Sequence, residues 1–101
     1  MNKILKNLFL IVIFTLFTNL GAQETFILNY EDVDIKKVTQ DIAQFSKKTI
    51  ILDPRVKGKV TIYSNANLDR DQVWDVYLRT IQVNGFGAIS EDGFLRVVPE
   101  N

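Results

Sequence analysis

The chain has no cysteine and no histidine, and its 101 residues include only two prolines and five glycines. Without cysteine, no disulfide bond can stabilise the fold and no thiol can act as a nucleophile. Without histidine, serine lacks its usual activating base, and transition metals lack their commonest ligand. We therefore expect neither an enzyme nor a bound cofactor or metal.

The first 22 residues predict a secretory signal peptide. Two lysines open the segment, an apolar run extends from Leu8 to Phe17, and cleavage is expected after the small residue Ala22. The alternative is an uncleaved membrane anchor, but the run is shorter than the roughly 20 residues that a spanning helix needs. No cysteine lies near the junction, which excludes a lipoprotein. We expect an exported mature domain at 23–101.

The mature domain is small and nearly neutral. Removing 22 of the 101 residues leaves 79, and the loss of Lys3 and Lys6 leaves 10 of the 12 basic residues against 12 acidic ones, a formal charge of −2. This balance gives no argument for nucleic acid or an anionic membrane surface as a partner. A domain of this size buries only about 60% of its unfolded surface, so we expect it to contact neighbouring domains, sister subunits or a partner.

Apolar periodicity predicts an α+β domain with the order β-α-β-β-α-β-β. Short runs of apolar and β-branched residues predict strands at 25–30, 49–52, 60–63, 86–90 and 94–98. The pattern alone is compatible with a ferredoxin-like split βαβ unit. Two helices between two small sheets fit it equally well.

Both helices have recognisable ends. Asp34 can cap the first helix, and Lys47 and Lys48 are predicted in its last turn. The second helix begins with a capping box at Asp69, ends at Gly85, and has a wide apolar stripe that places it centrally. One apolar stripe identifies the first helix: Ile35, Val38, Ile42 and Phe45.

Motifs that could carry chemistry are weak. The acidic residues Glu31, Asp32 and Asp34 lack the spacing of a calcium loop, so we interpret them as solvated residues ahead of a helix. Arg55 and Lys57 share a turn with acidic Asp53 and no aromatic residue, which favours a solvated turn over an anion site.

The outward positions of two strands are the best candidates for partner binding. If Val60 and Ile62 face the core, alternation turns Thr61 and Tyr63 outward, and the same reasoning turns Ile27 and Asn29 outward. Exposed apolar side chains at a sheet edge can mark docking by strand addition, although scattered surface residues are an equal alternative. The candidate partner-binding residues are Ile27, Asn29, Thr61, Tyr63, Arg55 and Lys57.

Four stretches together resemble the N-terminal periplasmic domain of secretins of type II secretion systems (general secretion pathway protein D). They are FILNYEDVDIKKV (26–38), IILDPRVKGKVTI (50–62), VWDVYLRTIQVNGF (73–86) and LRVVPEN (95–101). Their order and spacing match along essentially the whole predicted mature chain.

The resemblance implies the N-zero fold, with two helices flanked by a two-stranded and a three-stranded β-sheet. It also implies a periplasmic domain in a homo-oligomeric ring of sister subunits, whose full-length parent is an outer-membrane channel for secreted proteins. In that family the domain docks onto the inner-membrane platform, notably general secretion pathway protein C.

Two alternatives to the secretin interpretation remain open. Secretins continue with further ring domains and a membrane-embedded barrel, so we expect a chain ending at Asn101 to be either a piece of a secretin or a free periplasmic regulatory domain. The fold also serves as the signalling domain of TonB-dependent receptors. Those usually end the second helix in a Gly-Thr-Gly-Leu-like turn, whereas residues 83–86 here read VNGF.

Overall fold

The structure is a computed structural model that describes residues 23–100. The predicted signal peptide at 1–22 lies outside the described residues. The strands are β1 (Asn29–Asp34), β2 (Thr49–Leu52), β3 (Lys59–Tyr63), β4 (Phe86–Glu91) and β5 (Phe94–Pro99), and the helices are α2 (Ile35–Ser46) and α3 (Arg70–Val83). The predicted order and the α+β class are confirmed.

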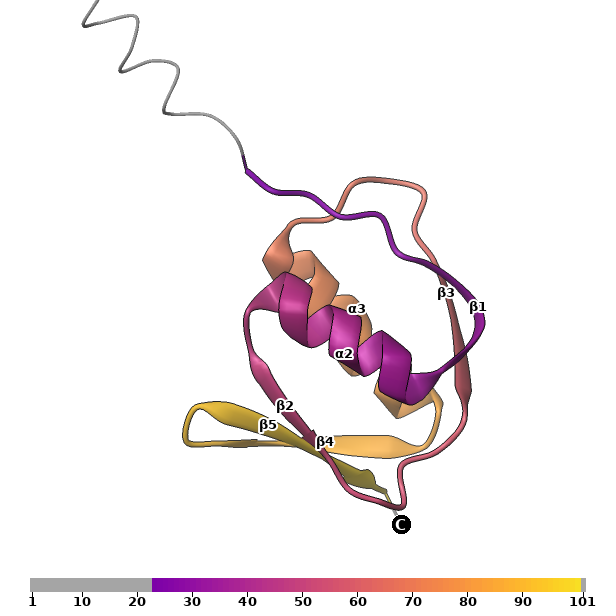
Figure 1. The fold of residues 1–101 in the computed structure, drawn as a ribbon, viewed down its shortest axis with the longest axis vertical. Coiled ribbons are helices and arrows are strands. Elements are labelled where there is room, and N and C mark those ends of the chain that lie inside the picture. Colours follow the sequence, from indigo (N-terminus) through magenta and orange to yellow (C-terminus); the bar gives the residue numbers. More distant parts are fainter. Residues whose placement is uncertain (1–22, 101) are drawn as a thin grey trace, which may run out of the picture.

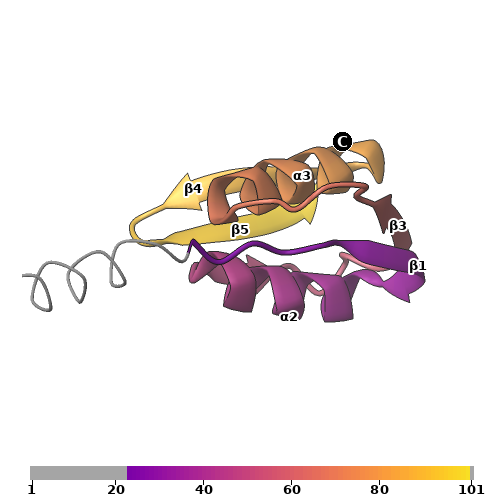
Figure 2. The ribbon, with the colours of Figure 1, turned by 90° about the horizontal axis from the view of Figure 1, so that it is seen from above.

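The strands form two separate sheets. In one, β1 pairs antiparallel with β3; in the other, the order is β2-β5-β4, with β5 parallel to β2 and antiparallel to β4. The two helices lie between these sheets (Figure 1) and run side by side (Figure 2). The arrangement of two flanking sheets is confirmed, and the ferredoxin-like alternative is wrong.

Local sequence signals start both helices. The Asp34 side chain accepts a hydrogen bond of 2.8 Å from the Lys36 backbone N–H at the start of α2. At α3, Asp69 and Gln72 form the predicted capping box with reciprocal bonds of 2.8 and 2.9 Å. Each bond satisfies a backbone N–H group at the start of the helix that has no carbonyl partner within the helix.

The core lies between the helices and the inner faces of both sheets. Its fully buried side chains of largest volume are Tyr77, Leu28, Ile35, Ile42, Ile81, Val38, Val56, Val73 and Val97. One hydrogen bond crosses this core, because the hydroxyls of Thr39 on α2 and Tyr77 on α3 lie 3.0 Å apart. Burial raises the pKa of Tyr77, which keeps the phenol neutral.

The first strand begins later than predicted. Phe26 makes only an isolated bridge with Leu68, and the regular strand runs from Asn29 to Asp34. The predicted alternation itself is right, since Leu28 is buried. The strand continues because β3 pairs with it across a bulge at Asp32, whose φ is +55°. The acidic residues therefore lie within β1, and they are exposed and directly precede α2, as predicted.

Two smaller predictions are also corrected. The first helix ends at Ser46, so Lys47 and Lys48 follow it instead of forming its last turn. Lys47 adopts a left-handed conformation with φ +56°, and its N–H donates to a helix carbonyl. The short β-branched run at Thr49–Leu52 also suggests a buried strand, but the strand is half exposed because it lies at the edge of the three-stranded sheet.

Candidate functional site

The described part of the chain contains neither a cluster of potential metal ligands nor a helix suited to span a membrane. Across residues 23–100, no group of three acidic side chains is placed to hold a metal ion. None of the helices in that range is both long and apolar enough to cross a bilayer.

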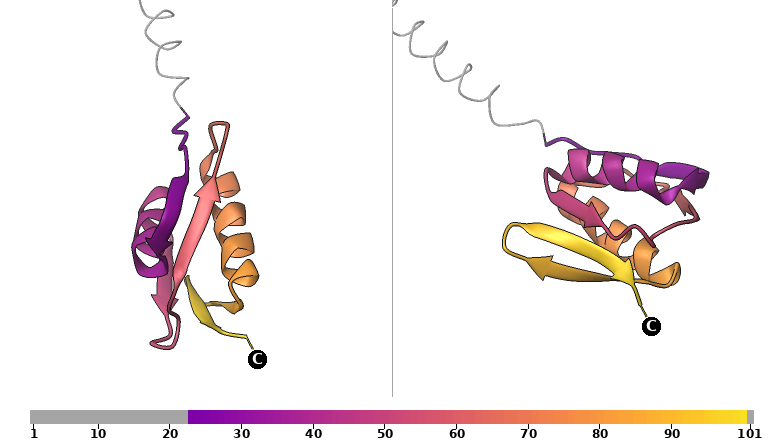
Figure 3. Two further views of the ribbon diagram at one scale, coloured as in Figure 1. Left: turned by 90° about the vertical axis from the view of Figure 1, so that its right-hand side faces the viewer. Right: turned by 60° about the horizontal axis from the view of Figure 1, so that its bottom comes forward.

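Four of the predicted partner-binding residues form one surface. Asn29 lies directly opposite Tyr63 in the β1–β3 pairing, and Thr61 and Ile27 each lie two residues away along their own segment. Tyr63 and Ile27 are 65% and 64% exposed, which is high for large apolar side chains. We call Ile27, Asn29, Thr61 and Tyr63 the docking face. In the left view of Figure 3, β1 and β3 face the viewer and α3 flanks β3, where Thr61 lines a shallow hollow with Val76, Arg79 and Thr80 of the helix.

The docking face is held by the layer beneath it. Val60, Ile62 and Leu28 point inward, with exposed fractions of 3%, 7% and 0%. Their burial fixes the outward direction of the alternate residues, because successive side chains of a strand point to opposite sides. A one-residue slip of the pairing would move the apolar set into solvent, so the register is strongly specified.

Hydrogen bonds fix both ends of the docking face. The Leu28 N–H donates to the Ser64 hydroxyl, and the Ser64 N–H donates to the Leu28 carbonyl, each at 2.8 Å. At the bulge, the Asp32 N–H donates to the Thr61 hydroxyl at 3.0 Å. Ile27 therefore lies on an ordered segment, although it precedes the regular strand.

Arg55 and Lys57 lie elsewhere. They belong to the loop before β3, whereas Tyr63 ends that strand, and the five residues from Lys59 to Tyr63 span about 13 Å. The structure therefore does not bring Arg55 and Lys57 together with the docking face.

The loop that carries Arg55 is a compact polar turn. Both carboxylate oxygens of Asp53 accept hydrogen bonds from the Arg55 guanidinium, at 2.9 and 3.0 Å, and one also accepts from the Arg55 backbone N–H. These bonds lower the pKa of Asp53 to about 2. Val56, next in the chain, is 1% exposed and joins the core. Sequence patterns missed this burial because charged residues and a glycine surround the valine.

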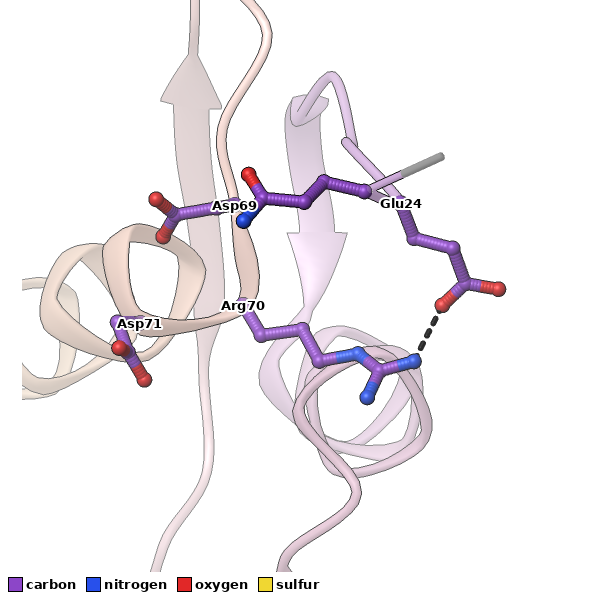
Figure 4. A pocket seen from close by; sticks show the side chains of 5 residues that line it. Glu24, Asp69, Arg70 and Asp71 are labelled. Atoms are coloured by element: carbon purple, nitrogen blue, oxygen red, sulfur yellow. Dashed lines mark hydrogen bonds and ion pairs between the residues drawn. The ribbon is translucent and has the colours of Figure 1, made fainter. Parts of the chain in front are cut away.

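Two shallow pockets lie away from the docking face. One, of about 590 Å³, is lined by Gln23, Glu24, Asp69, Arg70 and Asp71, and Arg70 forms an ion pair with Glu24 across it (Figure 4). The guanidinium lowers the pKa of Glu24. In the other, of about 400 Å³, the Lys48 ammonium lies 4.6 Å from the centroid of the Trp74 ring. This cation–π contact was not predicted, since the two residues are distant in sequence.

Comparison with known proteins identifies the family. Residues 28–97 match the family described as "GspD-like, N0 domain". The chain is 32% identical over 72 residues to secretin XcpQ of Pseudomonas aeruginosa, and this match covers 71% of the chain but 11% of XcpQ. The chain thus spans about a tenth of the length of that curated relative.

Two solved structures show the same fold. The N0 domain of the type II secretin from enterotoxigenic Escherichia coli has a TM-score of 0.71 and 32% identity, and the match covers 79% of this chain and 100% of that one. The GspC–GspD complex of the type II secretion system of enterotoxigenic E. coli has a TM-score of 0.67 and 28% identity, covering 75% and 57%. The chain belongs to the N0 domain family of type II secretins.

Proposed function

We propose that this chain is the periplasmic docking domain of a type II secretin, and that it binds a GspC-like inner-membrane platform protein through the docking face. The observation that carries the proposal is the docking face itself, in which two large apolar side chains are 64% and 65% exposed on the outer side of the two-stranded sheet. Partner surfaces are enriched in such aromatic and aliphatic anchors with polar residues around them.

The solved relatives support this choice of partner. One structure is a complex of GspC with GspD, and a second contains PulD, PulS and the PulC HR domain from Klebsiella pneumoniae. The second matches this chain with a TM-score of 0.63 and 31% identity. In both, the secretin part shares the fold described above, so a GspC-like protein is the partner that we infer for this chain.

The wider setting belongs to the same proposal. Residues 1–22 act as a signal peptide that exports the domain to the periplasm, and sister subunits form a ring whose parent is an outer-membrane channel for secreted proteins. The match to the N0 family supports this setting over the signalling domain of a TonB-dependent receptor. Sequencing the gene beyond codon 101 tests it, because further secretin domains would support the proposal and a receptor plug and barrel would contradict it.

Binding to the periplasmic part of the GspC-like protein from the same genome tests the docking. We expect Ile27→Asp and Tyr63→Asp each to raise the dissociation constant about tenfold or more, since burying a charge in an apolar contact costs more than the 1.4 kcal/mol that a factor of ten represents. Isothermal titration calorimetry measures the affinity. Both side chains are largely exposed in the free domain, so its melting temperature should stay the same.

A matched control separates the effect of the surface from the effect of added charge. Gln40→Glu also introduces one negative charge, but at an exposed position of α2, and should leave the affinity unchanged. Unchanged affinity for both docking-face variants would move the docking face elsewhere. Failure of the unmodified domain to bind the partner would refute the docking function.

A further inference from the structure

The three-stranded sheet has two free edges, formed by β2 and β4. Among the described residues, no hydrogen bond reaches the outer edge of β2 or of β4, since β5 lies between them and pairs with both. Free edges can pair with another chain, and proteins usually protect them with charges, proline or bulges. The edge of β1 is protected in this way by its acidic residues and by the bulge at Asp32.

The edge of β4 is protected in this way only next to the turn, by its last residue, Glu91. Its first five residues, FGAIS, are uncharged, it contains no proline, and it pairs with β5 over six consecutive positions without a bulge. The half nearest the turn is exposed from Ala88 to Glu91 on both sides of the strand. The tip of the β4–β5 hairpin projects beyond the helices (Figures 1 and 3). This half of the strand therefore lacks a covering partner within the described chain.

The register of the sheet aligns the two free edges. Arg96 on β5 lies opposite Ile51 of β2 on one side and opposite Ile89 of β4 on the other, so the three residues form one row. Ile51 and Ile89 are 46% and 41% exposed on the outer side of the sheet. Phe94 aligns Thr49 with Glu91 in the same way, which gives a second row.

The charges beside the edges are complementary. Lys47 and Lys48 immediately precede Thr49, and Glu91 is followed by Asp92 at the hairpin turn. Because β4 runs antiparallel to β2, a second copy placed beside the first without a shift would bring its β2 antiparallel to the first copy's β4. In that register, Ile89 meets Ile51 of the next copy, and the two lysines lie beside Glu91 and Asp92. Glu91 also pairs with Arg96 of its own chain at 2.8 Å, and Lys48 lies over the Trp74 ring of its own chain, so Lys47 and Asp92 carry the complementarity.

We propose that copies of this domain associate head to tail by strand addition, with β4 of one copy pairing antiparallel with β2 of the next. Head-to-tail contacts of this kind close into a ring when the rotation between copies permits it. The inference deepens the ring of sister subunits in the proposed function, by naming the contact between them. It uses no residue of the docking face, so self-association and partner binding can fail independently.

Disulfide trapping tests the register, because the natural chain has no cysteine. The test uses residues 23–101, which contain the whole core, and the solved N0 domain of enterotoxigenic E. coli shows that such a domain folds alone. Ile51→Cys and Ile89→Cys are prepared separately and mixed at millimolar concentration, comparable to that of linked copies. Opposed residues of antiparallel strands have Cα atoms about 4.5–5.5 Å apart, within disulfide range.

We expect the mixture to form disulfide-linked dimers at least about tenfold faster than either variant alone, owing to proximity. The double variant should form a ladder of larger covalent oligomers. It cannot close a bond within one chain, because β5 separates the two positions by about 9.6 Å. As a control, mixing Ile89→Cys with Gln40→Cys should give no acceleration.

Two results would overturn the proposal. If Ile89→Cys alone dimerised as fast as the mixture, the β4 edges would pair with each other, which is a two-fold contact and not a head-to-tail one. If no variant or mixture formed intermolecular disulfides at millimolar concentration, the free edges would not be an interface between copies. Retained GspC-like binding in either case would leave the docking function standing.

Discussion

Replacing Tyr77 with phenylalanine removes one hydroxyl from the interface between α2 and α3. That hydroxyl lies 3.0 Å from the Thr39 hydroxyl, and the two residues are 0% and 5% exposed, so water does not replace a lost partner easily. A buried polar group left without a hydrogen bond costs about 1–3 kcal/mol. The two single substitutions should nevertheless differ in cost.

In the Tyr77→Phe variant, the Thr39 hydroxyl can turn to the α2 carbonyl of Ile35, four residues earlier, so we expect a loss of about 1 kcal/mol. In Thr39→Val, the phenolic hydroxyl has no such local acceptor, and we expect about 2 kcal/mol. The double variant leaves only apolar groups and should lose less than the sum, with a coupling energy of about 1–2 kcal/mol. For a domain of this size, each kcal/mol lowers Tm by about 4–8 °C.

Urea and thermal unfolding of the four proteins gives the cycle, with fluorescence of the single tryptophan as the probe. Trp74 suits this purpose because its ring centroid lies 5.9 Å from that of Tyr77. Strictly additive losses would refute the hydrogen bond between the helices. Two neutral single variants would show that the hydroxyls do not contribute to stability.

Four further substitutions test other parts of the fold. Asp69→Ala removes the α3 cap and should cost about 1 kcal/mol, measured by thermal unfolding; an unchanged Tm would contradict the capping role. Arg55→Ala should raise the pKa of Asp53 from about 2, followed by NMR titration of its carboxyl. Because the pKa of Asp53 is lower in the folded protein, its ionised carboxylate stabilises the fold at pH values above the unfolded pKa of about 4. This stabilisation is lost as the pH falls toward 2, and the variant should lack most of this acid dependence. Ile42→Ala should cost about 2–5 kcal/mol, but Lys57→Glu at most about 0.5 kcal/mol, and similar losses in urea unfolding would contradict the solvated turn.

Local patterns predicted most of the elements. The capping box at Asp69 and the alternation in β3 depend on residues close in sequence, and both are present as expected. The start of β1 was misplaced because it depends on β3, which lies some 30 residues away. The bulge at Asp32, with its positive φ, let pairing continue through an acidic stretch that reads as a loop. Short polar residues such as aspartate tolerate this backbone conformation better than most.

The candidate site was predictable only in part. Alternation was enough to place Ile27 and Tyr63 outward, because the buried set on the same segments fixed the direction of every other side chain. The separation of Arg55 from Tyr63 is set by the extended β3 between them, so the predicted strand already argued against grouping Arg55 with this face. The parallel pairing of β2 with β5 is a long-range contact that local patterns do not specify. The row that aligns Ile51 with Ile89 depends on this pairing, so it could not be predicted either.

NMR titration of the labelled domain with the periplasmic part of its GspC-like partner tests the central claim most directly. The account predicts that the largest shift changes fall on the docking face, at Ile27, Asn29, Thr61 and Tyr63, and that the outer face of the β2-β5-β4 sheet stays unchanged. Saturable changes confined to another face, or no changes at all, would contradict it.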